Sequence, residues 1–421
     1  MSLMSLKIDE IYETEIIGLE NEGAGVAKIN GIIVFVPKAL VGEKLRVRII
    51  EIKKNFARGK IVEILEKSSN RITPSCPYYQ ECGGCNLRHQ TKEENLKFKK
   101  EKVETALKKI GKIDVVVDDI VPFFKENNYR NKVSFKVEND RIGFYGEGTY
   151  QLINVENCML AENEINNALT VIRNYIKNYE NEIKTITIKY GNAAKDILID
   201  IFSTNTHDID ILEYLDKNIN NLKTVIFNGN VVFGNGYIKQ ISNGLMFNCS
   251  SKSFFQVNSN QAEKLYETAI SLAKLSKEDI VLDLYCGTGT ITSIIASFVK
   301  KVIGIEIVND AIIDAKCNLE INGIQNVKFI CGDATKEISK IKEKIDVIFV
   351  DPPRKGMDRK AIAIMKKLSP KKIIYISCNP VTLSRDLNYL NDLYDVKKVI
   401  PFDMFPNTSH VECVSLLCLK K

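Results

Sequence analysis

The chain has 421 residues, a formal net charge of +6 and 11 cysteines. This length exceeds what one hydrophobic core usually serves, so we expect two to three domains. The small positive charge suits a polyanionic partner but does not distinguish nucleic acid from an acidic protein or metabolite. No apolar run approaches the roughly 20 residues of a membrane span. We therefore expect a cytoplasmic protein without a membrane partner, whose cysteines stay reduced.

The N-terminal part is predicted to form a small closed β-barrel over residues 4–65. The opening Met-Ser-Leu occurs twice, so the first three residues are left out of the domain. Short alternating apolar runs separated by glycines are typical of the strands of such a barrel. Within it, "KKNFARGK" places Phe56 among positive charges, a candidate surface for RNA.

A cluster of cysteines follows the barrel. Cys76, Cys82 and Cys85 form the pattern C-x5-C-x2-C, with Gly83 and Gly84 between them. Four-cysteine zinc sites usually contain two C-x2-C pairs, whereas three clustered cysteines with one distant partner suit an iron–sulfur cluster better. The spacing therefore favours an iron–sulfur cluster, and zinc remains an alternative.

The rest of the chain divides into a central domain, residues 66–245, and a C-terminal domain, residues 246–421. The central domain contains the cysteine cluster, then a helix pattern over about 93–110, which could pack on the C-terminal domain, and then mixed strands and helices. In the C-terminal domain, strand-like runs alternate with helix-length segments; the runs are "IVLDLY", "KVIGIE", "VKFICGD", "IDVIFVDPP" and "KIIYISCNP". This alternation predicts an α/β domain, a Rossmann-like parallel sheet covered by helices on both faces.

Polar residues stand where these predicted strands end, the position at which open parallel sheets bind ligands. They are Asp283, Glu306, Asp333, Asp351 and Cys378. The first strand leads into the glycine turn "DLYCGTGT", and Glu306 ends the second strand, where a carboxylate can bind ribose hydroxyls. A nucleotide-like ligand is therefore expected. A dinucleotide is not favoured, because Thr292 occupies the third position of G-x-G-x-x-G.

The same turn and strand end, together with "GDA" at 332–334 and "DPP" at 351–353, resemble the S-adenosylmethionine-dependent methyltransferases. Most such enzymes need no cysteine, but carbon 5 of uracil becomes nucleophilic only after a thiolate adds to carbon 6. Cys378 suits this role, because Pro380 should begin a helix whose N-terminus lowers the thiol pKa. A base must then remove the carbon 5 proton, and Glu412 in "HVEC" is the candidate.

The motifs "FFQVN" (254–258), "DLYCGTG", "DPPRKG", "SCNP" and "HVE" resemble those of the RNA uracil-5-methyltransferases. The resemblance extends over nearly the whole chain, since the barrel resembles the OB-like, RNA-binding TRAM domain of the ribosomal branch. It implies that Cys378 is the nucleophile and Glu412 the proton acceptor. The implied contacts of S-adenosylmethionine are Gln256, Tyr285, Glu306 and Asp351, and the methyltransferase motifs add Asp333.

The resemblance also bears on the cysteine cluster. Family members that carry a 4Fe-4S cluster show the same cysteine arrangement, and it implies Cys158, in "VENCML", as the fourth ligand beside Cys76, Cys82 and Cys85. We expect such a cluster to be structural or to help hold RNA.

The sequence therefore predicts a monomeric enzyme that methylates carbon 5 of a uridine in RNA, with 23S ribosomal RNA as the favoured substrate. Besides the barrel, "YRNKVSF", which begins at Tyr129, is a candidate RNA contact. Three alternatives stay open. They are a transfer RNA substrate, methylation of an amino group, and a non-catalytic RNA-binding iron–sulfur protein.

Overall fold

The computed structural model describes residues 6–420, so the predicted domain start at Met4 lies outside the described residues. The chain forms two compact units. The first comprises Met1–Lys102 and Phe405–His410, and the second comprises Val103–Met404 and Val411–Lys421. No helix within residues 6–420 is long and apolar enough to cross a membrane.

The first unit contains a six-stranded sheet in the order β1-β5-β6-β4-β3-β2. Its strands are β1 (Ile11–Glu15), β2 (Gly18–Leu19), β3 (Gly25–Ile29), β4 (Ile32–Val36), β5 (Lys44–Ile52) and β6 (Phe56–Glu66). Buried and exposed residues alternate along β5, as the period of a strand with one face on a core requires. A Cβ at Gly59 would lie 2.2 Å from Val47 Cγ1, so the core leaves room only for glycine there.

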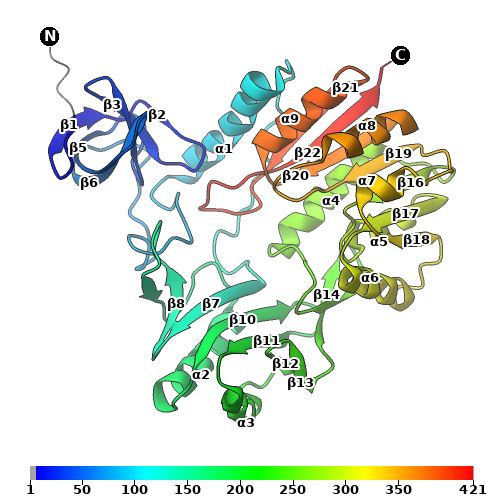
Figure 1. Ribbon diagram of the computed structural model, residues 1–421, viewed down its shortest axis with the longest axis horizontal. Helices are drawn as coiled ribbons and strands as arrows, with labels where there is room; N and C mark the ends of the chain where they lie inside the picture. The colour runs from blue at the N-terminus through cyan, green and yellow to red at the C-terminus, as the bar shows by residue number, and fades with distance from the viewer. Residues whose placement is uncertain (1–5, 421) are drawn as a thin grey trace. The chain divides into compact units, whose positions relative to one another are not determined.

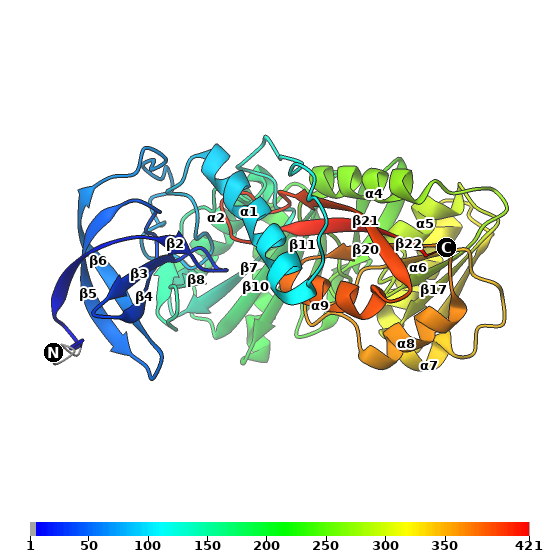
Figure 2. The same cartoon turned by 90° about the horizontal axis from the view of Figure 1, so that it is seen from above.

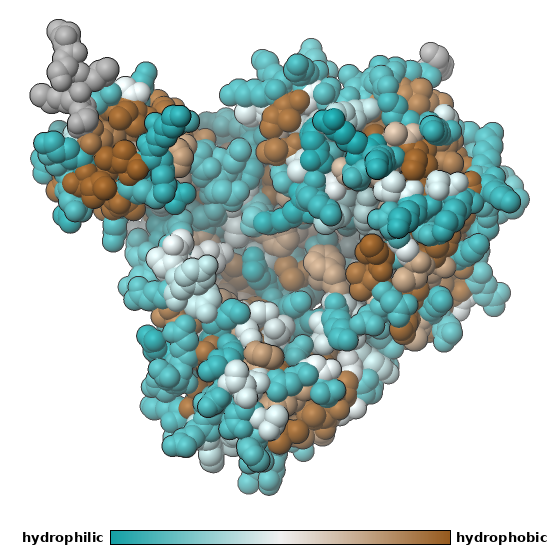
Figure 3. All heavy atoms as spheres, viewed as in Figure 1, coloured by the Kyte–Doolittle hydropathy of each residue, from teal (hydrophilic) through white to brown (hydrophobic). Residues whose placement is uncertain are grey.

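The outside of this sheet also carries apolar side chains, which Figure 3 shows on its surface. The exposed ones on or beside its strands are Ile8, Ile11, Ile17, Val41, Ile50, Ile52, Val62 and Leu65. Charged side chains are interspersed with them, for example Arg46, which forms ion pairs with Glu13 and Glu63.

The cysteine-bearing segment after β6 has little regular structure. Arg71 links it to the six-stranded sheet, because its guanidinium forms an ion pair with the fully buried Glu43 directly before β5. The helix α1 (Lys92–Ala106) follows and continues as the π-helical turn η1 (Leu107–Gly111), which confirms the helix predicted over about 93–110. Residues Phe405–His410 pack with this part of the first unit, where Lys99 donates to the Phe405 carbonyl at 3.0 Å.

The central part of the second unit is a seven-stranded sheet in the order β13-β12-β11-β10-β7-β8-β9. Its strands are β7 (Lys132–Glu138), β8 (Arg141–Tyr145), β9 (Leu152–Asn154), β10 (Ile183–Gly191), β11 (Asp196–Ser203), β12 (Leu222–Phe227) and β13 (Asn230–Gly234). Helices α2 (Asn163–Asn178) and α3 (Ile211–Asn218), with the 3-10 turn η2 (Thr206–Asp210), lie on one face (Figure 1). Their apolar sides share one core with the sheet.

A hairpin, β14 (Tyr237–Ser242) and β15 (Leu245–Ser250), leads from this sheet to a second seven-stranded sheet of order β18-β17-β16-β19-β20-β22-β21. Its strands are β16 (Ile280–Leu284), β17 (Lys301–Glu306), β18 (Val327–Cys331), β19 (Val347–Val350), β20 (Lys372–Ser377), β21 (Tyr394–Phe402) and β22 (Glu412–Leu419). Strands β16 to β20 are parallel, and β22 runs antiparallel to both β20 and β21.

Helices cover both faces of this sheet, as the alternating sequence pattern predicted. Figure 2 shows α4 (Ser259–Ala273) on one side and α7 (Ala334–Ile338), α8 (Arg359–Leu368) and α9 (Pro380–Leu390) on the other. The remaining helices are α5 (Thr290–Ala296) and α6 (Asn309–Ile321). Strand order reverses between β16 and β19, so the loops after these strands border the crevice in which doubly wound sheets bind ligands.

Candidate active site

The loop after β16 has a backbone that favours glycine. Gly287 and Gly289 have positive φ angles of 54° and 75°, and Tyr285 adopts the same region at 64°. A Cβ at Gly289 would lie 2.7 Å from the Phe329 ring, whereas the space beside Gly287 is open. Thr292, at the position where a dinucleotide motif has glycine, instead hydrogen-bonds the buried Asp283. The loop therefore leaves free space beside the main chain at Gly287, where a ligand could lie.

Glu306, at the end of β17, is bonded to this loop. Its carboxylate accepts backbone N–H groups of Gly287 at 3.1 Å, Ile307 at 2.8 Å and Val308 at 2.9 Å. A carboxylate offers about four lone-pair sites. Three backbone bonds leave one acceptor position for a ribose hydroxyl. Glu306 therefore shapes the glycine loop in addition to its predicted ligand contact, a role that the sequence did not reveal.

Replacing Glu306 with alanine is expected to weaken S-adenosylmethionine binding by about 1–3 kcal/mol, because hydrogen bonds to a charged group are lost. Calorimetric titration measures the affinity directly, and a melting curve shows whether the variant is folded. Glu320→Ala, on α6, is a matched control outside the loop. Unchanged affinity in a folded Glu306→Ala protein would remove Glu306 from the cofactor site.

The other predicted strand-end carboxylates have different surroundings. Asp333 caps α7, accepting the Lys336 N–H at 3.2 Å. Asp351 directly follows β19, and loss of solvation raises the pKa of its carboxyl to about 7. Burial likewise raises the pKa of Asp283 to about 7, with the charges of Asp351 and Glu306 adding to it. A bound cation would lower these raised pKa values, because an opposite charge favours the ionised form of a carboxyl. The two carboxyls therefore suit a cationic ligand.

Cys378 and Glu412 meet at the ends of neighbouring strands. Ser377, the last residue of β20, pairs with Cys413 of the antiparallel β22. One residue beyond this pair, the same register sets Cys378, after β20, opposite Glu412, the first residue of β22. Glu412 is 4% exposed. Two residues far apart in the sequence are thus brought together as a thiol beside a carboxyl.

The predicted helix begins after Cys378 as expected, with Asn379 as N-cap and Pro380 in its first turn. The predicted effect on the thiol is nevertheless wrong. Burial, followed by the charges of Glu412 and Asp351, raises the pKa of Cys378 to about 11, and the Arg354 charge opposes this only in part. Burial and the Asp351 charge also raise the pKa of Glu412 to about 8.

Arg354, within "DPPRKG", is a further candidate site residue that sequence reasoning did not single out. Its charge favours the ionised forms of both Cys378 and Glu412. Its carbonyl is fixed by α9, accepting Asn379 Nδ2 at 3.1 Å and Thr382 Oγ1 at 3.1 Å. Its position directly after two prolines at the end of a predicted strand could have marked it as a site residue.

The rate at which an alkylating reagent modifies Cys378 should follow these charges. At pH 9, above the pKa of about 8 for Glu412, Glu412→Gln removes a negative charge and should lower the thiol pKa, so alkylation becomes faster. Arg354→Met removes a positive charge and should slow it. Mass spectrometry of the Cys378 peptide measures each rate, with the exposed Cys317 as an internal reference. The reverse order would contradict this arrangement of charges.

Gln256 and Tyr285, implied only by resemblance, lie near the same loop in sequence and fold. Gln256 is buried at 8% exposure, and its carbonyl accepts Asn131 Nδ2 at 3.0 Å. Thr288, in the glycine loop, donates to the Phe254 carbonyl at 3.5 Å. Tyr285 is half-buried, and burial raises its pKa to about 12. The segment 254–256 therefore borders the glycine loop.

The cysteines expected to bind iron do not form a metal site in the part of the chain described. Cys76, Cys82, Cys85 and Cys158 are all half-buried. Within residues 6–420, no group of three or more His, Cys, Asp or Glu side chains is placed to hold a metal ion. Cys158 packs at the edge of the core under α2, and Asn166 binds its backbone N–H. The structure thus gives no support to the cluster.

The candidate RNA contacts differ in exposure. Phe56 is half-buried and lies edge-on against Phe35, with 5.4 Å between ring centroids. In "YRNKVSF", however, Tyr129 and Phe135 are buried at 3% and 0% exposure. Tyr129 and Phe135 therefore belong to the protein core, and this stretch does not offer their rings to RNA as a stacking contact would require.

The sheet order, the glycine loop and the acidic strand ends together define a Rossmann-like, S-adenosylmethionine-dependent methyltransferase. Residues 91–420 match the family model described as tRNA (Uracil-5-)-methyltransferase, and residues 7–62 match the TRAM domain. The chain therefore belongs to the tRNA (uracil-5-)-methyltransferase family and carries an N-terminal TRAM domain.

Relatives of similar length support this assignment. An uncharacterized RNA methyltransferase of Clostridium acetobutylicum is 39% identical, covering 99% of this chain and 98% of that protein. An uncharacterized RNA methyltransferase of Oceanobacillus iheyensis is 38% identical, covering 98% of this chain and 97% of that protein. The crystal structure of Pyrococcus abyssi tRNA (uracil-54, C5)-methyltransferase with S-adenosyl-L-homocysteine matches 96% of this chain and 99% of that chain, at 25% identity and a TM-score of 0.79. The predicted fold class and the class of enzyme, an S-adenosylmethionine-dependent RNA uracil-5-methyltransferase, are confirmed.

Proposed function

We propose that this enzyme methylates carbon 5 of a uridine in 23S ribosomal RNA through a covalent bond to Cys378, with Glu412 as the base. The single observation that carries the mechanism is the strand register that places Cys378 beside Glu412. The proposal includes a monomeric enzyme in the cytoplasm, where its thiols stay reduced.

The residues have complementary roles in the proposed reaction. The Cys378 thiolate adds to carbon 6 of the uracil, and the electron pair of the 5,6 double bond moves into an enolate. Carbon 5 then takes the methyl group that S-adenosylmethionine supplies. Glu412 accepts the proton from carbon 5, the double bond re-forms, and the Cys378 sulfur leaves as thiolate. Because both groups must be ionised, Arg354 assists by favouring both charges.

The cofactor would be held by residues around the glycine loop. The open space beside Gly287 and the remaining acceptor position of Glu306 fit an adenosine. The carboxyls of the buried Asp283 and the half-buried Asp351 fit the positive charge of a sulfonium. Gln256, Tyr285 and Asp333 complete the proposed set.

Two RNA classes compete as substrate. Ribosomal RNA is supported by the TRAM domain together with the cysteine spacing, which resemble the ribosomal branch of the family. Transfer RNA is the second candidate, because a tRNA methyltransferase from Pyrococcus abyssi shares the fold over 96% of this chain. Methyl transfer from labelled cofactor to separated 23S and transfer RNA from cells lacking the protein decides between them. Label confined to transfer RNA would overturn the ribosomal proposal.

The iron–sulfur cluster remains part of the proposal because of the cysteine spacing and the family resemblance. Within residues 6–420 the cysteines do not form a metal site, so no step of the reaction is assigned to a cluster. Anaerobically purified protein is expected to contain about four irons per chain, and Cys158→Ala should lose them. Cys317→Ala, at an exposed thiol, is the matched control. Stoichiometric zinc without iron, or full iron in Cys158→Ala, would contradict this expectation.

A further inference from the structure

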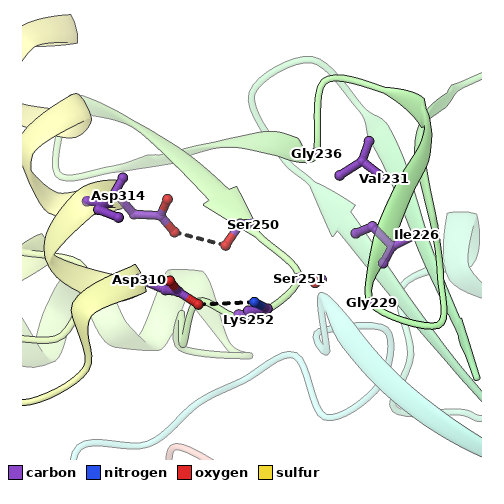
Figure 4. A pocket seen from close by; sticks show the side chains of 10 residues that line it. Ile226, Gly229, Val231, Gly236, Ser250, Ser251, Lys252, Asp310 and Asp314 are labelled. Atoms are coloured by element: carbon purple, nitrogen blue, oxygen red, sulfur yellow. Dashed lines mark hydrogen bonds and ion pairs between the residues drawn. The ribbon is translucent and has the colours of Figure 1, made fainter.

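A short loop, residues 250–253, begins at the last residue of β15 and leads to the segment that borders the glycine loop. Its first three residues line a cavity of about 240 Å³. Figure 4 shows Ser250 and Lys252 facing Asp314 and Asp310 of α6, with Ile226 and Val231 on the other side. The loop therefore lies between the central sheet and a helix of the methyltransferase sheet.

Lys189 on β10 holds the backbone of this loop. Its side chain is 5% exposed, and its Nζ donates to the carbonyls of Ser250 at 2.7 Å, Ser251 at 2.8 Å and Ser253 at 3.1 Å. A lysine ammonium has three donors, and all three are used on main-chain oxygens of one loop. An amine in this environment is costly, since burial lowers the Lys189 pKa to about 8.

The charges around Lys189 only partly compensate for that cost. Lys132 on the neighbouring strand lowers its pKa further, whereas Asp200, Cys249 and Asp314 act in the opposite direction. An apolar residue would fill the same space without a buried charge, so the hydrogen bonds to the loop are the distinctive contribution of Lys189.

Asp314 holds the same loop from the opposite side. Its carboxylate accepts the hydroxyl of Ser250 at 2.9 Å and also that of Ser253. The two serine hydroxyls lie 2.7 Å apart. Thus β10 fixes the main chain of the loop and α6 fixes its side chains, while the exposed Lys252 forms a surface ion pair with Asp310.

We propose that Lys189 is a positioning residue for the cofactor, because it fixes residues 250–253 and thereby sets Phe254 and Gln256 beside the glycine loop. Phe254 directly follows the anchored loop, and Gln256 stands two residues further along, where its carbonyl accepts a hydrogen bond from Asn131 Nδ2. The inference rests on the proposed function in one respect, the contact of Gln256 with S-adenosylmethionine. Asp314 is the second residue that holds this loop in place.

The test compares Lys189→Met with Lys252→Met, which removes an exposed lysine from the same loop. Lys189→Met is expected to raise the dissociation constant and KM for S-adenosylmethionine at least tenfold, with kcat at saturating cofactor within about twofold of the original, since only binding is affected. Lys252→Met should change neither. A purely structural role would lower the melting temperature of Lys189→Met and leave cofactor affinity of the folded protein unchanged, and that result would overturn the proposal.

If Lys189→Met does not fold, Asp314→Asn decides, because it weakens the second anchor without opening the core. It too should raise the dissociation constant, and unchanged affinity would reject the proposal. Gln256→Ala separates this inference from the proposed cofactor contact. Weakened binding in Lys189→Met but not in Gln256→Ala would keep the loop anchor and reject the Gln256 contact.

Discussion

Cys378→Ala is expected to abolish methyl transfer to RNA, reducing kcat by on the order of 10⁴-fold or more, as removal of a catalytic nucleophile does. Without addition at carbon 6, carbon 5 of uracil has no electron pair to offer the methyl group. Binding of S-adenosylmethionine should be unchanged, because the thiol is not among the proposed cofactor contacts. Transfer of labelled methyl groups and calorimetric titration measure the two quantities separately.

The matched control is Cys317→Ala, which removes an exposed thiol on α6 and should retain full activity. Continued methyl transfer by Cys378→Ala would point to an amino group as the acceptor, since a nitrogen lone pair needs no covalent activation. Binding of RNA and cofactor without transfer by the original protein would instead support a non-catalytic RNA-binding role.

Glu412→Gln is expected to slow turnover by about 10²- to 10⁴-fold, the usual contribution of a general base, while addition and methylation still proceed. Glutamine preserves the shape of the side chain but cannot accept the carbon 5 proton. The enzyme should therefore stay attached to methylated RNA. The proposed cofactor contacts, such as Glu306, are unchanged in this variant, so cofactor binding should be retained, which calorimetry checks.

The C-terminal sheet was predictable because its strands are continuous apolar runs with helices between them. The run "KVIGIE" is the whole of β17, and the predicted helix start at Pro380 is the start of α9. Since parallel strands end at one edge of a sheet, the polar residues after those strands could be grouped without knowing the strand order.

The pairing of Cys378 with Glu412 could not be derived from local pattern. It depends on β22 entering the sheet antiparallel between β20 and β21, a tertiary arrangement that no local pattern encodes. The predicted lowering of the Cys378 pKa was wrong because it, too, depends on residues that only the tertiary fold brings close. Helix α9 begins where predicted, but burial and the carboxylates of Glu412 and Asp351 outweigh it.

The surface assignments were the least predictable. Tyr129 stands in a basic, aromatic stretch that is typical of an RNA contact, yet its ring is buried beside Phe123 at 5.8 Å between centroids. Lys189 shows the opposite case: lysines are usually exposed, but this one lies inside the fold, bonded to three carbonyls. Composition does not tell which face of a strand reaches solvent.

The covalent mechanism is tested most directly by trapping the enzyme on its product. The original protein, Cys378→Ala, Glu412→Gln and the double variant are each incubated with target RNA and methyl-labelled S-adenosylmethionine, then run on a denaturing gel. Only Glu412→Gln is predicted to accumulate a labelled protein–RNA band. Normal turnover by Glu412→Gln without such a band, or the same band in Cys378→Ala, would contradict the roles assigned to these two residues.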